Sequence, residues 1–151
     1  MDDISEALAA LTDREPDRRD VAADTLGDIL RSSGPSADTA RMIVGRLVSV
    51  AIDEPVTKIR ESALNAISEA VDHHRLPLDL VALLTAAMPT MEPELLEHAL
   101  YILGATHAPQ ASQLIEPFLH HPDPQVRKEA QLAAGEITAA DPEGLTRMST
   151  K

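Results

Sequence analysis

Cysteine is absent from this 151-residue chain, so it has no disulfide framework and no thiolate chemistry. Aromatic residues are almost absent as well, because there is no Trp and Tyr101 and Phe118 are the single Tyr and Phe. A β-sandwich core relies on aromatic and β-branched side chains, whereas closely packed helices are built well from Ala, Leu, Ile and Val. The composition therefore predicts an all-α protein.

Basic residues are scarce, since 13 Lys and Arg stand against 25 Asp and Glu, for a formal net charge of −12. Proteins that bind nucleic acid present a basic face, because their affinity comes from neutralising phosphates and releasing counterions. We therefore expect no nucleic acid partner, and electrostatic steering favours a basic protein partner. An acidic surface also keeps a protein soluble, so the net charge alone leaves that simpler explanation open.

Long hydrophobic runs are missing too. The most apolar stretch, residues 42–52, is interrupted by Arg46 and is too short to cross a bilayer. The acidic start Met1-Asp2-Asp3 does not resemble a secretory signal. We therefore expect no membrane association and a cytoplasmic location.

The chain does contain an internal repeat, with one alanine anchor in each copy: Ala22, Ala63, Ala99 and Ala130. Around most anchors apolar residues stand four positions before the anchor and three, four and seven positions after it. This is the spacing of one buried helix face. A small residue follows each anchor by five positions, and we expect it to let neighbouring helices approach closely: Gly27, Ser68, Gly104 and Gly135. The anchors recur at intervals typical of two-helix repeats.

Each repeated helix is preceded by an acid and a proline: Glu15-Pro16, Glu54-Pro55, Glu92-Pro93 and Asp123-Pro124. Proline suits the first helical position, and the acid suits the positive end of the helix dipole. In the second copy the proline lies two residues further from its anchor, which predicts a longer turn. Three copies also carry an arginine three positions before the anchor, for which we expect contacts to acids of adjacent repeats: Arg19, Arg60 and Arg127.

Four more amphipathic segments lie between these helices, at residues 4–11, 40–51, 80–88 and 111–118. The sequence therefore predicts eight helices in one domain, residues 1–140, followed by a polar tail at 141–151. The helices pair into about four hairpins, at residues 3–32, 38–72, 77–107 and 109–139.

The run Asp123-Pro124-Gln125-Val126-Arg127, three residues before Ala130, resembles the second helix of a HEAT repeat. Ile59-Arg60-Glu61-Ser62-Ala63 carries the same mark, whereas the first copy lacks the apolar position and the third lacks the arginine. The resemblance covers about residues 3–139. It implies a right-handed α-α superhelix, an armadillo-like α-solenoid whose second helices line the concave side. HEAT proteins are mostly interaction scaffolds, so the motif indicates architecture rather than a specific function.

The face of each second helix opposite its buried face is the expected partner-binding surface. It is acidic in the first three copies and mixed in the fourth, and its candidate residues are Asp20, Asp24, Asp28, Glu61, Asn65, Glu69, Glu97, His98, Tyr101 and Lys128. Tyr101 lies in its middle, and tyrosine is enriched in binding hot spots. The alternative is that these residues are simply the solvated side of the helices.

Signals for catalysis are weak. No pair among the six His has the i, i+4 spacing that places two metal ligands on one helix face. The chain has no phosphate-binding glycine loop, nucleophile elbow or Cys/His arrangement. We therefore expect no catalytic residue, no metal and no cofactor.

The sequence thus predicts a non-catalytic module that holds a basic partner protein, as a monomer or within a heteromeric complex. Small HEAT proteins of this size resemble immunity proteins or antitoxins, which implies a toxin as one candidate partner. A scaffold or assembly subunit is the alternative. HEAT-like bilin lyases supply an enzymatic alternative, although the chain carries no residue signature for that activity.

Overall fold

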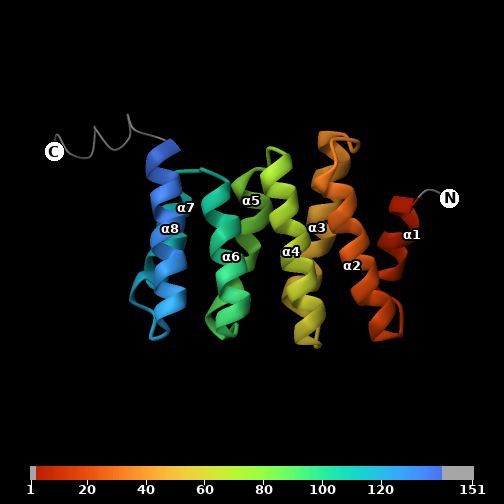
Figure 1. The fold of residues 1–151 in the computed structure, drawn as a ribbon, viewed down its shortest axis with the longest axis horizontal. Helices are drawn as coiled ribbons and strands as arrows, with labels where there is room; N and C mark the ends of the chain where they lie inside the picture. Colours follow the sequence, from red (N-terminus) through yellow and green to blue (C-terminus); the bar gives the residue numbers. More distant parts are fainter. Residues whose placement is uncertain (1–2, 141–151) are drawn as a thin grey trace. The chain divides into compact units, whose positions relative to one another are not determined.

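A computed structural model of the chain describes residues 3–140. Within that range every regular element is helical and no strand occurs, which confirms the all-α prediction (Figure 1). The chain divides into two compact units, Met1–Leu76 and Pro77–Lys151. The predicted tail at 141–151 lies outside the described residues, and the single-domain assignment stays a prediction.

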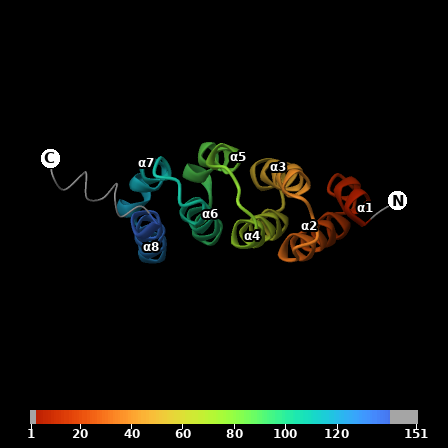
Figure 2. The same cartoon turned by 90° about the horizontal axis from the view of Figure 1, so that it is seen from above.

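The first unit contains helices α1 (Asp3–Ala10), α2 (Pro16–Arg31), α3 (Ala37–Asp53) and α4 (Thr57–His73). Within this unit α1 and α3 lie in one layer, and α2 and α4 lie in the other (Figure 2). Helix α2 packs along α4, and α3 packs against α4. The first two predicted hairpins therefore correspond to α1–α2 and α3–α4.

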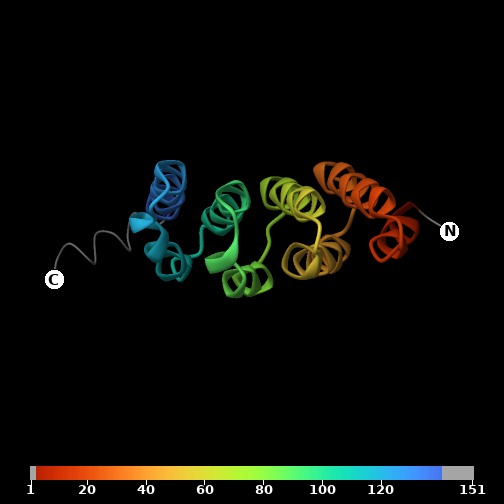
Figure 3. The same cartoon turned by 90° about the horizontal axis from the view of Figure 1, so that it is seen from below.

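The second unit has the same order but shorter first helices. Its elements are α5 (Leu78–Val81), η1 (Ala82–Ala86), η2 (Met88–Thr90), α6 (Pro93–Ala105), α7 (Ala111–Ile115), η3 (Glu116–His120) and α8 (Pro124–Ala140). Within this unit α5 and α7 lie in one layer and α6 and α8 in the other (Figure 3). Helix α6 packs along α8, as α2 packs along α4 in the first unit.

The acid-proline pairs mark the helix starts correctly at α2, α6 and α8, where the proline is the first helical residue. At α4 the longer turn predicted for this copy is found, because α4 begins at Thr57, two residues after Pro55, with Val56 as its N-cap residue. Glu54 is instead the C-cap residue of α3, and its backbone N–H donates to the Val50 carbonyl. Pro55 therefore belongs to the turn, which absorbs the two extra residues of this copy.

The two continuous helices expected at 80–88 and 111–118 are each replaced by a short α-helix followed by 3-10 turns. Proline explains the break in the second case, because it lacks an N–H and its ring clashes with the carbonyl four residues earlier. Helix α7 accordingly ends at Ile115, two residues before Pro117. The expected apolar face is still buried in the first case, where Val81, Leu84 and Met88 are fully covered.

The core of each unit is apolar, and no polar or charged residue in the described range is buried. All four alanine anchors are buried, as the repeat predicts: Ala22, Ala63, Ala99 and Ala130. Among the largest fully buried side chains are Leu26, Ile59 and Leu64 in the first unit and Leu84, Leu95 and Leu100 in the second. Leucine and isoleucine thus fill the space that aromatic residues occupy in many other proteins.

Small residues bring the long helices of each unit together in one shared register. A Cβ at Gly27 of α2 would lie 3.2 Å from the Ala66 Cβ of α4, and a Cβ at Gly104 of α6 would lie 2.8 Å from that of Ala133 of α8. In both units the glycine follows its anchor by five positions and the alanine follows the next anchor by three. The expected close approach is therefore confirmed at these two glycines, whereas Gly135 has open space beside it.

The repeated arginines hold the turns before their helices. Arg19 donates to both carboxylate oxygens of Glu54, at 3.0 and 2.9 Å, and this hydrogen-bonded pairing raises the pKa of its guanidinium. Arg127 donates instead to the carbonyl oxygens of His121 and Pro122, and Arg60 donates to that of Ala51. The predicted contact with an acid is confirmed for Arg19, while Arg60 donates to a backbone carbonyl of α3 and Arg127 donates to carbonyls of the turn before α8.

Candidate functional site

The outward rows of α2 and α4 form the most acidic part of the predicted binding surface. Asp20, Asp24 and Asp28 follow one another at i, i+4 and i+8 along α2, so they lie in one row. Glu61, Asn65 and Glu69 form the equivalent row on α4. We call these six residues the α2–α4 face.

Side-chain contacts join the two rows at the N-terminal ends of the helices. The Ser62 hydroxyl on α4 donates to Asp20 Oδ1 at 2.5 Å, and Lys58 Nζ lies 3.6 Å from Asp20 Oδ2. The Asp20 side chain is only 15% exposed, and Ser62 supplies a hydrogen bond in place of part of its lost hydration. Asp20 therefore has a structural role as well as a place on the face.

Arg31 joins the rows at the other end of α2. Its guanidinium lies 3.3 Å from both Asp28 Oδ1 on its own helix and Glu69 Oε2 on α4. Between the two junctions is a depression of about 290 Å³, whose lining includes Asp24, Asn65 and the close contact of Gly27 with Ala66. The structure thus brings Asp24, Asp28, Asn65 and Glu69 into one shallow groove.

Asp24 is exposed, but its carboxyl lies between two other carboxylates of the same row, those of Asp20 and Asp28. Partial burial, followed by the negative charges of Asp20 and Asp28, raises the pKa of its carboxyl, while Ser62 and Lys58 act in the opposite direction. Carboxylates gathered in this way repel one another unless a cation approaches. The face therefore keeps a negative potential despite the contacts of Lys58 and Arg31.

Replacing Asp24 by asparagine is expected to stabilise the folded protein at neutral pH. The folded-state pKa lies above the ordinary value of 3.8, so the folded protein binds the Asp24 proton more tightly than the unfolded chain does. The folded protein therefore loses stability as the pH rises from the ordinary pKa of 3.8 through the raised folded-state pKa of Asp24. Asparagine does not ionise, so D24N does not undergo this loss. The urea midpoint of D24N should exceed that of the wild type near neutral pH, and the difference should vanish near pH 3, where Asp24 is protonated in both states.

Asp38→Asn is the matched control, because its carboxylate is 96% exposed and lies 3.6 Å from Arg41 on α3. It should give no stabilisation at neutral pH. An equal gain from D38N would show that the effect comes from total charge rather than from the crowding of carboxylates on α2.

The corresponding rows of the second unit carry Glu97, His98 and Tyr101 on α6 and Lys128 on α8. Glu97 comes close enough to Glu129 of α8 to help burial raise the pKa of the Glu129 carboxyl, against the lowering effect of Lys128. Tyr101 is 41% exposed, and Leu132, in the row of Lys128, is 55% exposed. This α6–α8 face is therefore mixed, with carboxylates, one lysine and two exposed apolar or aromatic side chains.

The predicted site residues thus fall into two sets, one in each unit, and their union in a single groove stays a prediction. The periodicity of one helix at a time could not reveal the residues that join neighbouring helices. Arg31, Lys58, Ser62 and Glu129 were missed for this reason, since each acts on a carboxylate of another helix. A basic or hydroxyl residue beside an acidic row is the signal that could have suggested Arg31, Lys58 and Ser62, whereas no such signal marks Glu129.

Among residues 3–140 no group of three or more His, Asp or Glu side chains is placed to hold a metal ion. No helix in that range combines the length and the apolar character required to cross a membrane.

Comparison with known proteins yields a likeness of fold only. No family model matches the chain, and no curated protein matches it. The fold is similar to the crystal structure of an engineered protein, with a TM-score of 0.64 and 18% sequence identity. The match covers 91% of this chain and 63% of the engineered protein, so the chain spans less than two thirds of that protein's length.

Proposed function

We propose that this protein is a non-catalytic binding module whose α2–α4 face holds a basic partner protein. The observation that carries the proposal is the gathering of five carboxylates on two adjacent rows, with Lys58 and Arg31 as the cations that contact them. A cationic partner would offset the repulsion from Asp20 and Asp28, which adds to desolvation in raising the pKa of Asp24. Such a face gives association speed and specificity through electrostatic complementarity.

We further propose that the two units continue one HEAT-type solenoid, a right-handed superhelix of about four hairpins. The shared register of Gly27 with Ala66 and of Gly104 with Ala133 supports a common repeat. The buried alanine anchors and the proline starts of α2, α6 and α8 support it as well. In such a solenoid the α2–α4 and α6–α8 faces would form one concave surface, with Tyr101 as an aromatic anchor.

Two biological versions of this function follow, both consistent with a cytoplasmic protein. In a neutralising version the protein covers the active surface of a basic toxin, as an immunity protein or antitoxin does. In the other version it is a scaffold or assembly subunit and leaves its partner active. A bilin-lyase-like role is the enzymatic alternative, which no particular residue of the chain favours.

The test is capture of the partner by the tagged protein at low and at high salt. The double variant Asp24→Lys with Glu61→Lys should reduce capture of the wild-type partner at least tenfold, because it reverses charge in both rows. Capture by the wild type should weaken as salt screens the face. An assay of the partner's own activity then separates the versions, since only neutralisation predicts its inhibition.

Asp38→Lys with Asp53→Lys is the matched control, because it makes the same change of net charge on exposed positions of α3 in the other layer. This control should capture the partner as the wild type does. Equal losses in the two double variants, or capture that is insensitive to salt, would contradict the assignment of the α2–α4 face.

A further inference from the structure

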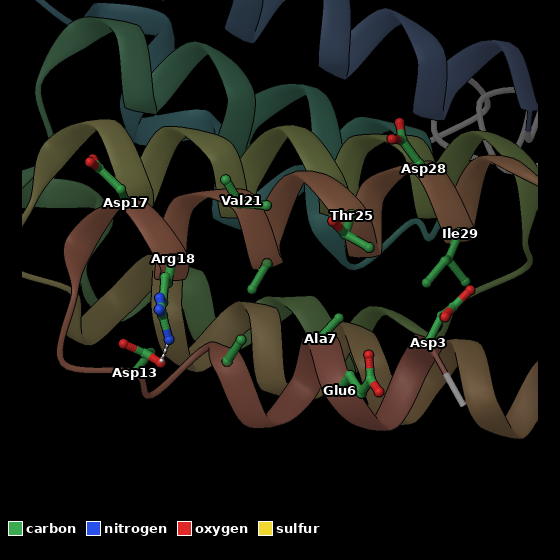
Figure 4. Close-up of a pocket in the computed structure, with 12 residues that line it drawn as sticks. Asp3, Glu6, Ala7, Asp13, Asp17, Arg18, Val21, Thr25, Asp28 and Ile29 are labelled. Carbon is green, nitrogen blue, oxygen red and sulfur yellow. Dashed lines mark ion pairs between the residues drawn. The ribbon is translucent and has the colours of Figure 1, made fainter. Parts of the chain in front are cut away.

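The side of the first unit bounded by α1 and α2 carries an open groove that the α2–α4 face does not include. It has a volume of about 650 Å³ and lies between the two helices (Figure 4). Its apolar lining includes Ala7 and Ala22, which are buried, and the α2 side chains Val21, Thr25 and Ile29. Val21 is 62% exposed, so a large apolar side chain that lines this groove faces solvent.

The rim of this groove is acidic. Its charged residues are five carboxylates and one guanidinium, namely Asp3, Glu6, Asp13, Asp17, Asp28 and Arg18. The single cation is already engaged, because Arg18 lies 3.7 Å from Asp13 (Figure 4). An apolar lining inside a negatively charged rim suits a ligand with an apolar centre and positive flanks.

The dimensions of the groove fit a helix. Val21, Thr25 and Ile29 stand at i, i+4 and i+8, so they form one ridge along α2 of the kind that packs against a neighbouring helix. From Asp17 to Asp28 the helix axis rises about 17 Å, or roughly three turns, at about 1.5 Å per residue.

We propose that the α1–α2 groove docks an amphipathic helix of a basic partner protein, with apolar residues on one face and Lys or Arg on both flanks. A second copy of this chain is a poor occupant through the same groove, because it would bring the two acidic rims together. The proposal concerns a surface separate from the α2–α4 face, with only Asp28 lining both depressions.

The experiment uses a designed peptide of about 14 residues, bridged into a helix because free helices of this length are marginal in water. It carries Leu at i, i+3, i+4 and i+7 and Lys on both flanks, and a matched peptide carries Glu at the flanks. We expect the full-length protein to bind the Lys peptide, and the Glu peptide at least tenfold more weakly, in a fluorescence-anisotropy titration. Raising the salt concentration should weaken binding of the Lys peptide.

Val21→Glu should weaken binding of the Lys peptide at least tenfold, because it places a charge in the apolar lining. Leu83→Glu is the matched control, since Leu83 is 63% exposed but lies in the second unit, and it should bind as the wild type does. A charge-swapped rim, Glu6→Lys with Asp17→Lys, should instead prefer the Glu peptide. Circular dichroism of each variant shows that the helices remain folded.

Several results would overturn the proposal. They are absence of binding to the wild type, equal binding by V21E, equal affinity for both peptides, and a dimer of the wild type that V21E dissociates. The double variant Asp24→Lys with Glu61→Lys should leave peptide binding within about twofold. Peptide binding therefore tests the α1–α2 groove, and capture of the partner protein tests the α2–α4 face, so that either proposal can fail without the other.

Discussion

Leu84→Ala is expected to lower the free energy of unfolding by about 2–5 kcal/mol, the largest effect of any single change considered for this chain. Leu84 is fully buried in the 3-10 segment η1, where it contributes to the core of the second unit. Truncation removes apolar area from the core and leaves a cavity that short helical segments on either side fill only in part. Urea unfolding followed by circular dichroism measures the loss.

Its neighbour supplies the control, because Leu83 is 63% exposed in the same 3-10 segment. Leu83→Ala should change the free energy of unfolding by less than about 0.5 kcal/mol, as surface substitutions usually do. Similar losses from the two variants would contradict an orientation of η1 in which Leu84 is buried and Leu83 is exposed.

Gly104→Val is expected to destabilise the protein by about 2–3 kcal/mol through overpacking. A Cβ at this position would lie 2.8 Å from both the Cα and the Cβ of Ala133 and 3.1 Å from its carbonyl oxygen. Backbone atoms cannot rotate away, so α6 and α8 would have to separate. The free energy of unfolding in urea measures this cost.

Gly135→Ala tests whether a glycine at the same repeat position tolerates a side chain when no neighbouring helix lies close to it. Gly135 occupies the same repeat position in α8, but nothing lies within 4 Å of a Cβ placed there. Alanine should therefore stabilise the helix by about 0.5–1 kcal/mol, the ordinary gain over glycine inside a helix. A loss of stability in G135A would indicate a close neighbour at that position, and a neutral G104V would contradict the tight contact of α6 with α8.

Much of the helical pattern could be predicted because it depends on interactions that are local in the chain. The spacing around Ala22 and Ala99 predicted buried helix faces, and both anchors are buried. The acid-proline pairs predicted three of the four long helix starts, since proline at a first helical position is a local preference. The fourth start follows Pro55 by two residues, as the longer spacing of that copy predicted, and Glu54 there caps α3 and binds Arg19.

The candidate site was predictable only one helix at a time. The i, i+4 spacing placed Asp20, Asp24 and Asp28 in one row, and that row exists. The pairing of this row with α4 through Ser62 and Arg31 joins residues that are far apart in the sequence. No periodicity carries that information.

By itself the sequence determined the all-α class, the buried alanine anchors and the acidic outward rows, because periodicity and composition act along a single helix. Only the tertiary structure decided which of the small residues lie against a neighbouring helix. Gly27 and Gly104 each pack against an alanine of the next long helix, whereas Gly135 has open space beside it. The tertiary structure also decided that Val21 remains exposed in an acidic-rimmed groove between α1 and α2. The physical reason is that exposure and close contact depend on which helix lies alongside, and that neighbour is chosen by the packing of the whole unit.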